Sequence, residues 1–326
     1  MAPPRIAFPG TVMLVTTRVQ AGLPFVCNQL MELIVYSSLA RAQKVFPVIV
    51  CHFIVMGNHV HLLIVVKNPN DFIGFMDHFK TETAHAINRL LGRRQISVWC
   101  DSFHAAPILK ASDVVREIAY IYSNPSTADL EDTIESYPGV SSWAMYQEKR
   151  YVRKCHRIRR PAITKLKKTD LTYSEAASLA ESLKATSKSS HMLKIDPNAW
   201  MALFDITDKE QIDGLNEEIL SSLRARELEA RESRVREKRR CLGRERLMNQ
   251  PMDLQFSPKK FGEKMWCICS DKERRIEFIN FVKALLSKAH RVYLRWKQGD
   301  YSVPYPIGLF PPSLPRIADL VPPVFA

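Results

Sequence analysis

The sequence has no long apolar run and no sign of an export signal. No stretch in its 326 residues approaches the roughly 18 consecutive apolar residues that indicate a membrane-spanning helix. The N-terminus lacks a basic segment followed by an apolar one, so we expect no signal peptide. These absences exclude the integral membrane class and predict a cytoplasmic protein.

A cysteine framework is also missing. The seven cysteines are scattered, at Cys27, Cys51, Cys100, Cys155, Cys241, Cys267 and Cys269. An odd number without regular spacing fits a reducing compartment better than a disulfide-bonded secreted domain. The Cys267-Ile268-Cys269 pair has no second pair at zinc-finger spacing, so it does not predict a zinc site.

Acidic residues are absent from one basic segment that supplies most of the net charge of +13. Residues 1–148 hold 11 Lys and Arg against 12 Asp and Glu, whereas residues 149–168 hold ten basic residues and no acidic one. Such a basic block beside a near-neutral domain suggests that it binds the phosphate backbone of a nucleic acid. The alternatives are a solvated linker or a contact with an acidic face of the same chain.

The order of predicted elements indicates an α+β fold. We expect strands over residues 11–19, 48–56, 59–67, 96–100 and 106–110, and helices over 28–45, 71–91 and 112–123. The order β-α-β-β-α-β is that of a ferredoxin-like antiparallel sheet with helices on one face. We expect the last of these helices to cross the open face of the sheet.

The second half of the chain has a different, mainly helical pattern. A capping box at Thr172-Tyr173-Ser174-Glu175, Asp196 as a cap before Pro197, and the stretches 207–210 and 270–273 predict four further helices. Residues 303–326 are rich in proline, so we expect no regular structure there. We therefore divide the chain into a domain over 1–147, a basic linker over 148–170 and a helical region over 171–326, to which the sequence assigns no chemistry.

Two histidines form the most informative motif, Gly57-Asn58-His59-Val60-His61. On a strand, His59 and His61 point to the same face, whereas Val60 points to the other. Two imidazoles side by side can bind one divalent metal ion. The alternative is structural, since an imidazole also serves as an ordinary hydrogen-bonding group.

The second motif, Tyr120-Ile121-Tyr122-Ser123-Asn124-Pro125, lies at the end of a predicted helix. Tyr120 and Asn124 are four residues apart and share one face, whereas Tyr122 points about 160° away from Tyr120. Pro125 disfavours helical geometry at Asn124, so we expect the helix to end there. A metal, a phenol and an amide together suggest phosphodiester cleavage by tyrosine attack, while core packing of both tyrosines is the alternative.

These motifs resemble the HUH endonucleases, and in detail the REP-associated tyrosine transposases related to the transposases of single-stranded insertion sequences. The matching stretches, within residues 1–147, are 4–10 with 15–18, 56–63, Tyr120-Ile121 with Asn124-Pro125 and Ala128, and Tyr137-Pro138 with 141–143. Two departures stand out: Gly57 replaces the family's usual proline, and Met13-Leu14 replaces its usual Tyr-His.

The resemblance implies a metal-dependent transposase that cleaves and rejoins single-stranded DNA beside hairpins, a DNA recombination activity that would associate the protein with the nucleoid. It implies that Tyr120 is the nucleophile and that His59, His61 and Asn124 bind Mg²⁺ or Mn²⁺. For Asn124 the alternative is a helix-terminal role. The partner would be hairpin or single-stranded DNA, with no small-molecule cofactor.

Two alternatives remain open. The departures at Gly57 and Met13-Leu14 fit a catalytically inactive, domesticated relative that only binds hairpin DNA. The oligomeric state is also open, because the related proteins include dimers that share active sites and monomers that do not. Trp99, Phe103 and Trp143 either stack on unpaired bases or pack in the core.

Overall fold

The computed structural model describes residues 6–94, 96–100, 103–158, 162–257 and 265–310. The elements of its N-terminal half are β1 (Thr11–Arg18), α1 (Gln29–Val45), β2 (Ile49–Met56), β3 (His59–Val66), α2 (Pro69–Leu90), β4 (His104–Pro107) and α3 (Ala111–Thr127). This order matches the order predicted from the sequence.

The four strands form one sheet in the order β2-β3-β1-β4, and all neighbouring strands are antiparallel. This arrangement has the β-α-β-β-α-β order of a ferredoxin-like sheet. The predicted α+β fold class is confirmed.

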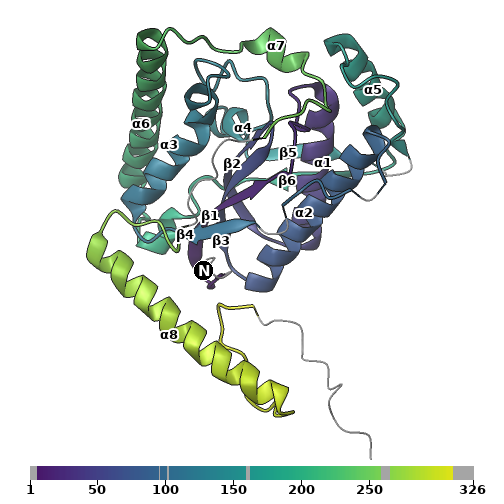
Figure 1. Cartoon of the computed structure of the whole chain (residues 1–326). Helices are drawn as coiled ribbons and strands as arrows, with labels where there is room; N and C mark the ends of the chain where they lie inside the picture. Colours follow the sequence, from purple (N-terminus) through teal and green to yellow (C-terminus); the bar gives the residue numbers. More distant parts are fainter. Residues whose placement is uncertain (1–5, 95, 101–102, 159–161, 258–264, 311–326) are drawn as a thin grey trace, which may run out of the picture.

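The two faces of the sheet carry separate hydrophobic cores. Val60, Leu62 and Ile64 of β3 face the core that contains α1 and α2, whereas Leu63 and Val65 face the core that contains α3. Figure 1 shows α1 and α2 on one side of the sheet and α3 on the other. The helix with the tyrosine motif therefore crosses the face that the first two helices leave open.

Two predicted strands differ from the structure. Residues 96–100 form only an isolated bridge between Val19 and Trp99. The Trp99 indole donates hydrogen bonds to the Lys80 carbonyl and the Thr83 hydroxyl, which ties this segment to α2 rather than to a longer ladder. The next strand is β4, which begins two residues before the predicted start and is only four residues long.

The second half of the chain adds a small ribbon and further helices. Its elements are α4 (Trp143–Gln147), β5 (Val152–His156), α5 (Tyr173–Ala185), β6 (Ser190–Lys194), the 3₁₀ helix η2 (Met201–Phe204), α6 (Lys209–Arg236), α7 (Arg244–Met248) and α8 (Lys272–Lys297). The predicted capping box is confirmed, because Thr172 accepts from the Glu175 backbone N–H. In the stretches 207–210 and 270–273 the capping residues are Asp208 and Asp271. The helix expected from Asp196-Pro197 corresponds to the short η2, which begins at Met201.

Segments beyond residue 147 contribute to both cores. In the interval expected as a linker, β5 pairs with β6, and Cys155 and Leu193 of this ribbon are buried against the α1 side. On the other side α6 packs along α3, with Ile219 and Leu223 fully buried (Figure 1). The ribbon and α6 are thus integral parts of the two layers.

The remaining features lie toward the C-terminus. The segment before α8 extends the free edge of β4 through a parallel bridge between Ile108 and Ile268. From there α8 runs along one end of the molecule (Figure 1). None of the helices within the described ranges is long and apolar enough to span a bilayer. The proline-rich stretch lies outside the described residues from position 311 onward.

Candidate active site and metal centre

The two histidines lie side by side at the start of β3. His61 pairs with Thr16 of β1 and Ile54 of β2, and His59 pairs with Arg18 and Met56. The centroids of the two imidazole rings are 4.8 Å apart. The strand alternation places both rings on the face that α3 covers, in agreement with the orientation expected for a His-X-His pair.

Neighbouring polar groups orient the imidazoles. The Thr16 hydroxyl lies 2.9 Å from Nδ1 of His61, and the Asn58 side-chain oxygen lies 2.7 Å from Nδ1 of His59. Because Asn58 Oδ1 can only accept, this contact favours the tautomer of His59 that carries its proton on Nδ1 and a lone pair on Nε2. Nε2 of His61 is buried and has no hydrogen-bond partner.

Burial keeps both histidines neutral. Burial, together with the smaller effect of the Arg18 guanidinium, lowers the pKa of His59 to about 4. Burial, the neighbouring His59 and Arg18 hold the pKa of His61 well below its ordinary value. A neutral imidazole is the form that binds a metal ion, so these groups fit the predicted donor role without prior loss of a proton.

Tyr120, and not Tyr122, faces the histidines. The ring centroids of Tyr120 and His61 are 5.3 Å apart. Tyr122 is fully buried, and its hydroxyl lies 2.8 Å from Nδ1 of His52 and 2.8 Å from the Ser142 hydroxyl. The two tyrosines therefore have different environments, and of the two phenols only that of Tyr120 is beside the histidine pair.

Asn124 completes the cluster, but the helix does not end there as predicted. α3 continues through Pro125 to Thr127. Pro125 has no N–H for the Ile121 carbonyl four residues earlier, and the Asn124 amide donates to that carbonyl (3.3 Å) and to the Tyr120 carbonyl (2.8 Å). This substitute bond explains how the helix tolerates the proline.

The same bonds leave the oxygen of the Asn124 amide available. Both of the amide's bonds to backbone carbonyls use Nδ2. The Asn124 side chain also lies within hydrogen-bonding reach of His59 and of the Tyr120 hydroxyl. The structure thus brings the four residues chosen from the sequence together, with two imidazole nitrogens and one amide oxygen as a donor set that suits Mn²⁺ and, less ideally, Mg²⁺.

Three charged residues near the site were not found from the sequence. Burial and the Glu117 carboxylate raise the pKa of Tyr120, whereas the cations of Arg18 and Arg226 lower it. Arg18 is the cross-strand partner of His59, so the pairing of β1 with β3 was a usable signal. Arg226 comes from α6, more than a hundred residues after Tyr120, and no local pattern indicates its position.

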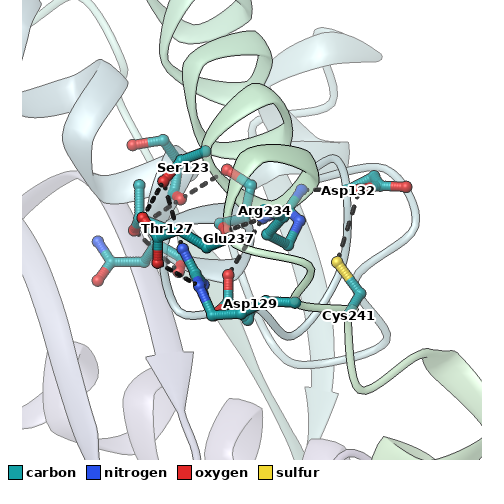
Figure 2. A network of polar contacts seen from close by, with 11 residues as sticks. Ser123, Thr127, Asp129, Asp132, Arg234, Glu237 and Cys241 are labelled. Atoms are coloured by element: carbon teal, nitrogen blue, oxygen red, sulfur yellow. Dashed lines mark hydrogen bonds and ion pairs between the residues drawn. The ribbon is translucent and has the colours of Figure 1, made fainter.

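A polar network joins the end of α3 to α6 (Figure 2). The buried guanidinium of Arg234 donates to the Ser126 carbonyl and, over 2.7 Å, to the Asp132 carboxylate. Arg239 pairs with Asp129. These contacts hold the turn that directly follows Asn124 and Pro125, so α6 supports the helix that carries two of the four site residues.

The aromatic residues considered for base stacking belong to the core. Trp99, Phe103 and Trp143 are each no more than 5% exposed. Trp99 packs beside Phe25, and Trp143 packs beside Tyr122. The core alternative is therefore correct for all three.

A comparison with known protein families matches the region that contains the four candidate site residues. The model of the family described as "Transposase IS200 like" matches residues 24–124, which include His59, His61, Tyr120 and Asn124. The match covers about a third of the chain and includes part of the stretches on which the resemblance was based; residues 24–124 are called the IS200-like segment below. No curated protein matches the chain.

One solved structure is also similar to this chain. It is described as a REP-associated tyrosine transposase bound to a REP hairpin, and it is 17% identical to this chain with a TM-score of 0.38. The match covers 46% of this chain and 87% of that one. A similarity of this degree does not define the ligand or the activity of the present protein.

Proposed function

We propose that this protein is a metal-dependent endonuclease and transposase that cleaves and rejoins single-stranded DNA near hairpins through a 5′-phosphotyrosine intermediate. The observation that carries the proposal is the position of Tyr120, with its ring centroid 5.3 Å from that of His61, whose buried Nε2 has no partner. The IS200-like segment contains His59, His61, Tyr120 and Asn124.

His59, His61 and Asn124 would hold the divalent ion. When bound, such an ion polarises the scissile phosphate and stabilises the charge that develops on its oxygens. Thr16 and Asn58 orient the two imidazoles through their Nδ1 atoms. Hydrogen bonds of this kind to the second ring nitrogen are typical of metal-binding histidines.

Tyr120 would be the nucleophile. Its phenolic oxygen forms a bond to the phosphorus, the bond from phosphorus to the 3′ oxygen breaks, and the products are a 5′-phosphotyrosine and a free 3′-OH. Because the phosphotyrosine conserves the energy of the broken linkage, rejoining requires no ATP. Arg18 and Arg226 favour the phenolate that attacks, which offsets part of the effect of burial on the pKa of Tyr120.

A covalent-adduct assay tests this assignment. The protein is mixed with labelled hairpin strands and Mn²⁺ or Mg²⁺, and SDS-resistant adducts are measured for wild type, Tyr120→Phe and Tyr122→Phe. We expect wild type and Tyr122→Phe to form the adduct and Tyr120→Phe to form none while still binding DNA. An adduct in Tyr120→Phe would refute the nucleophile assignment. EDTA should abolish the adduct in every variant.

The second candidate function is a catalytically inactive protein that binds hairpin DNA. Leu14 favours it: this residue replaces the family's usual histidine and lies opposite Leu63 on β3, beside the pair formed by Thr16 and His61. The site therefore has an apolar side chain where the resemblance implies a polar one. This function predicts DNA binding by the wild type without an adduct under any divalent metal.

A further inference from the structure

A groove with a cationic rim lies at the end of the sheet farthest from the histidines. Its volume is about 780 Å³, and its lining includes Lys44, Ile49, Val152, Met192 and Lys194. Ile49 pairs with Val65 of β3, six residues from His59. At about 3.3 Å per residue, the groove is roughly 20 Å from the proposed active site along the sheet.

The ribbon of β5 and β6 that lines the groove is firmly anchored. The Gln43 amide of α1 donates to the Lys194 carbonyl and accepts from the Lys194 N–H, both over 2.8 Å. The Asp196 N–H donates to the Val50 carbonyl of the edge strand β2. The groove is therefore a preformed surface between the ribbon, α1 and the edge of the sheet.

The outward face of the ribbon combines apolar and cationic side chains. Val152 and Met192 are each 52% exposed, and the register places Val152 opposite Lys194 and Lys154 opposite Met192. The two lysines are thus diagonal neighbours, with backbones about 7–8 Å apart. Their chains are long enough to contact separate phosphates on either side of the apolar pair.

The cations around the groove are mostly not neutralised within the protein. Lys44, Lys154 and Lys194 form no ion pair among the described residues, in contrast to Arg153, which pairs with Glu32. Partial burial lowers the pKa of His191, and the nearby cations of Lys44, Arg157 and Arg41 act in the same direction, which is consistent with positive charge gathered around the groove. Asp196 is the acidic residue in the lining.

We infer that this ribbon groove binds the single-stranded DNA that extends from the hairpin. Its apolar floor would contact the bases, and Lys44, Lys154 and Lys194 would contact the phosphates. Surfaces that bind single strands without reading their sequence combine a positively charged groove with aromatic side chains on which bases stack, and the lining here includes Tyr151 and His191. The inference rests on the proposed function and adds a second DNA contact to it, at the opposite end of the sheet from Tyr120.

The test compares two double substitutions that each replace two lysines by glutamines. The ribbon variant is Lys154→Gln with Lys194→Gln, and the matched control is Lys283→Gln with Lys288→Gln on the exposed face of α8, which is remote from the groove (Figure 1). Affinity is measured over a range of salt concentrations for a hairpin alone, for hairpins with 5′ or 3′ extensions of graded length, and for an unstructured strand. Thermal unfolding checks that both variants fold.

We expect the ribbon variant to lose about tenfold in affinity for hairpins with either the 5′ or the 3′ extension. The slope of log K against log salt should fall by about 1.4, because each of two lost phosphate contacts to a single strand contributes about 0.7. The control should behave like wild type. Equal affinities for the ribbon variant and the control would overturn the inference. An equal loss with the hairpin alone would also overturn it, since the ribbon would then hold the duplex stem.

The same experiment separates the inference from the proposed cleavage. If the ribbon effect appears but the wild type forms no adduct, the groove inference stands and the cleavage proposal fails. If adducts form normally but the ribbon substitutions leave all affinities unchanged, the cleavage proposal stands and the groove inference fails. A wild type that binds none of the strands would overturn both.

Discussion

At the scale of single residues, Asn124 combines two roles that its neighbours make compatible. Its nitrogen replaces the helical bond that Pro125 cannot form. Its oxygen takes no part in the backbone bonds, and the side chain lies within hydrogen-bonding reach of His59 and Tyr120. A helix-terminal role and a metal-binding role were alternatives in the sequence. The geometry shows that one side chain can serve both the backbone and the site.

Substitutions at Asn124 separate these roles. Asn124→Asp keeps an oxygen that can bind a metal ion but loses both hydrogen bonds to the backbone carbonyls. We therefore expect Mn²⁺ binding to persist while the free energy of unfolding falls by about 1–2 kcal/mol. Asn124→Ala should lower Mn²⁺ affinity at least about tenfold. Isothermal titration with Mn²⁺ and urea unfolding measure the two effects. Unchanged Mn²⁺ affinity in Asn124→Ala would remove this residue from the ligand set.

Buried histidines make stability depend on pH. Burial lowers the pKa of His52 to about 3, and its Nε2 lies 3.2 Å from the Pro197 carbonyl while Nδ1 faces the Tyr122 hydroxyl. In the unfolded chain the His52 imidazole has a pKa near 6.5. Below that pH it therefore binds a proton in the unfolded chain but not in the folded one. The stability contributed by the neutral ring is therefore complete above about pH 6.5 and is lost progressively as the pH falls toward about 3.

We expect the free energy of unfolding to decrease by up to about 1.4 kcal/mol per pH unit for each such histidine below about pH 6.5. Urea unfolding at a series of pH values measures this slope. His52→Asn should be less stable than wild type near neutral pH but should show a shallower decrease on acidification. Parallel curves for the two proteins would show that His52 does not contribute to the pH dependence.

At the scale of elements, local sequence signals predicted most helices and strands but not how these elements pack against one another. The capping box at Thr172 and the alternation around His59 and His61 are local, and both were visible in the sequence. The end of α3 was wrongly predicted at Asn124, because the proline rule cannot anticipate a side chain that replaces the missing bond. The packing of α6 on α3 depends on contacts far apart in the chain, so Arg226 and Arg234 were not found.

Arg234 tests the importance of that packing. Its guanidinium is only 3% exposed and donates to Ser126 and Asp132. Arg234→Met keeps much of the apolar chain but removes the buried guanidinium bonds to the Ser126 carbonyl and the Asp132 carboxylate, so we expect a loss of about 2–3 kcal/mol in the free energy of unfolding. Arg236→Met, an exposed change on the same helix, should cost less than about 0.5 kcal/mol. Equal costs would show that the network is not stabilising.

At the scale of the whole molecule, the region beyond the IS200-like segment forms part of the fold. Ile219 and Leu223 of α6 are fully buried in the core that also holds α3. The sequence indicated a helical region there but gave no sign of which surface it covers, since a charged helix with few apolar residues resembles a solvated one. The proposed boundary at residue 147 therefore describes sequence similarity better than it describes packing.

Truncated chains test this integration. A chain ending at residue 170 lacks β6 and α6, so we expect it to expose both cores, aggregate and show no cooperative unfolding. A chain ending at residue 257 lacks α8, which packs mainly against residues near Ile6 and Leu309, and we expect it to unfold cooperatively. Circular dichroism and size-exclusion chromatography distinguish the two. A cooperative fold in the shorter chain would establish residues 1–170 as an independent domain.

The adjacency of Tyr120 and His61 within one chain has a consequence for mixed populations. Each molecule carries its own complete set of site residues on β3 and α3, and α6 of the same chain holds α3 in place. Under the proposed function, a defective copy would therefore neither borrow a tyrosine from an intact neighbour nor deprive that neighbour of one. In a cell that expresses intact and inactive alleles together, the proposed cleavage activity should then follow the number of intact molecules in direct proportion.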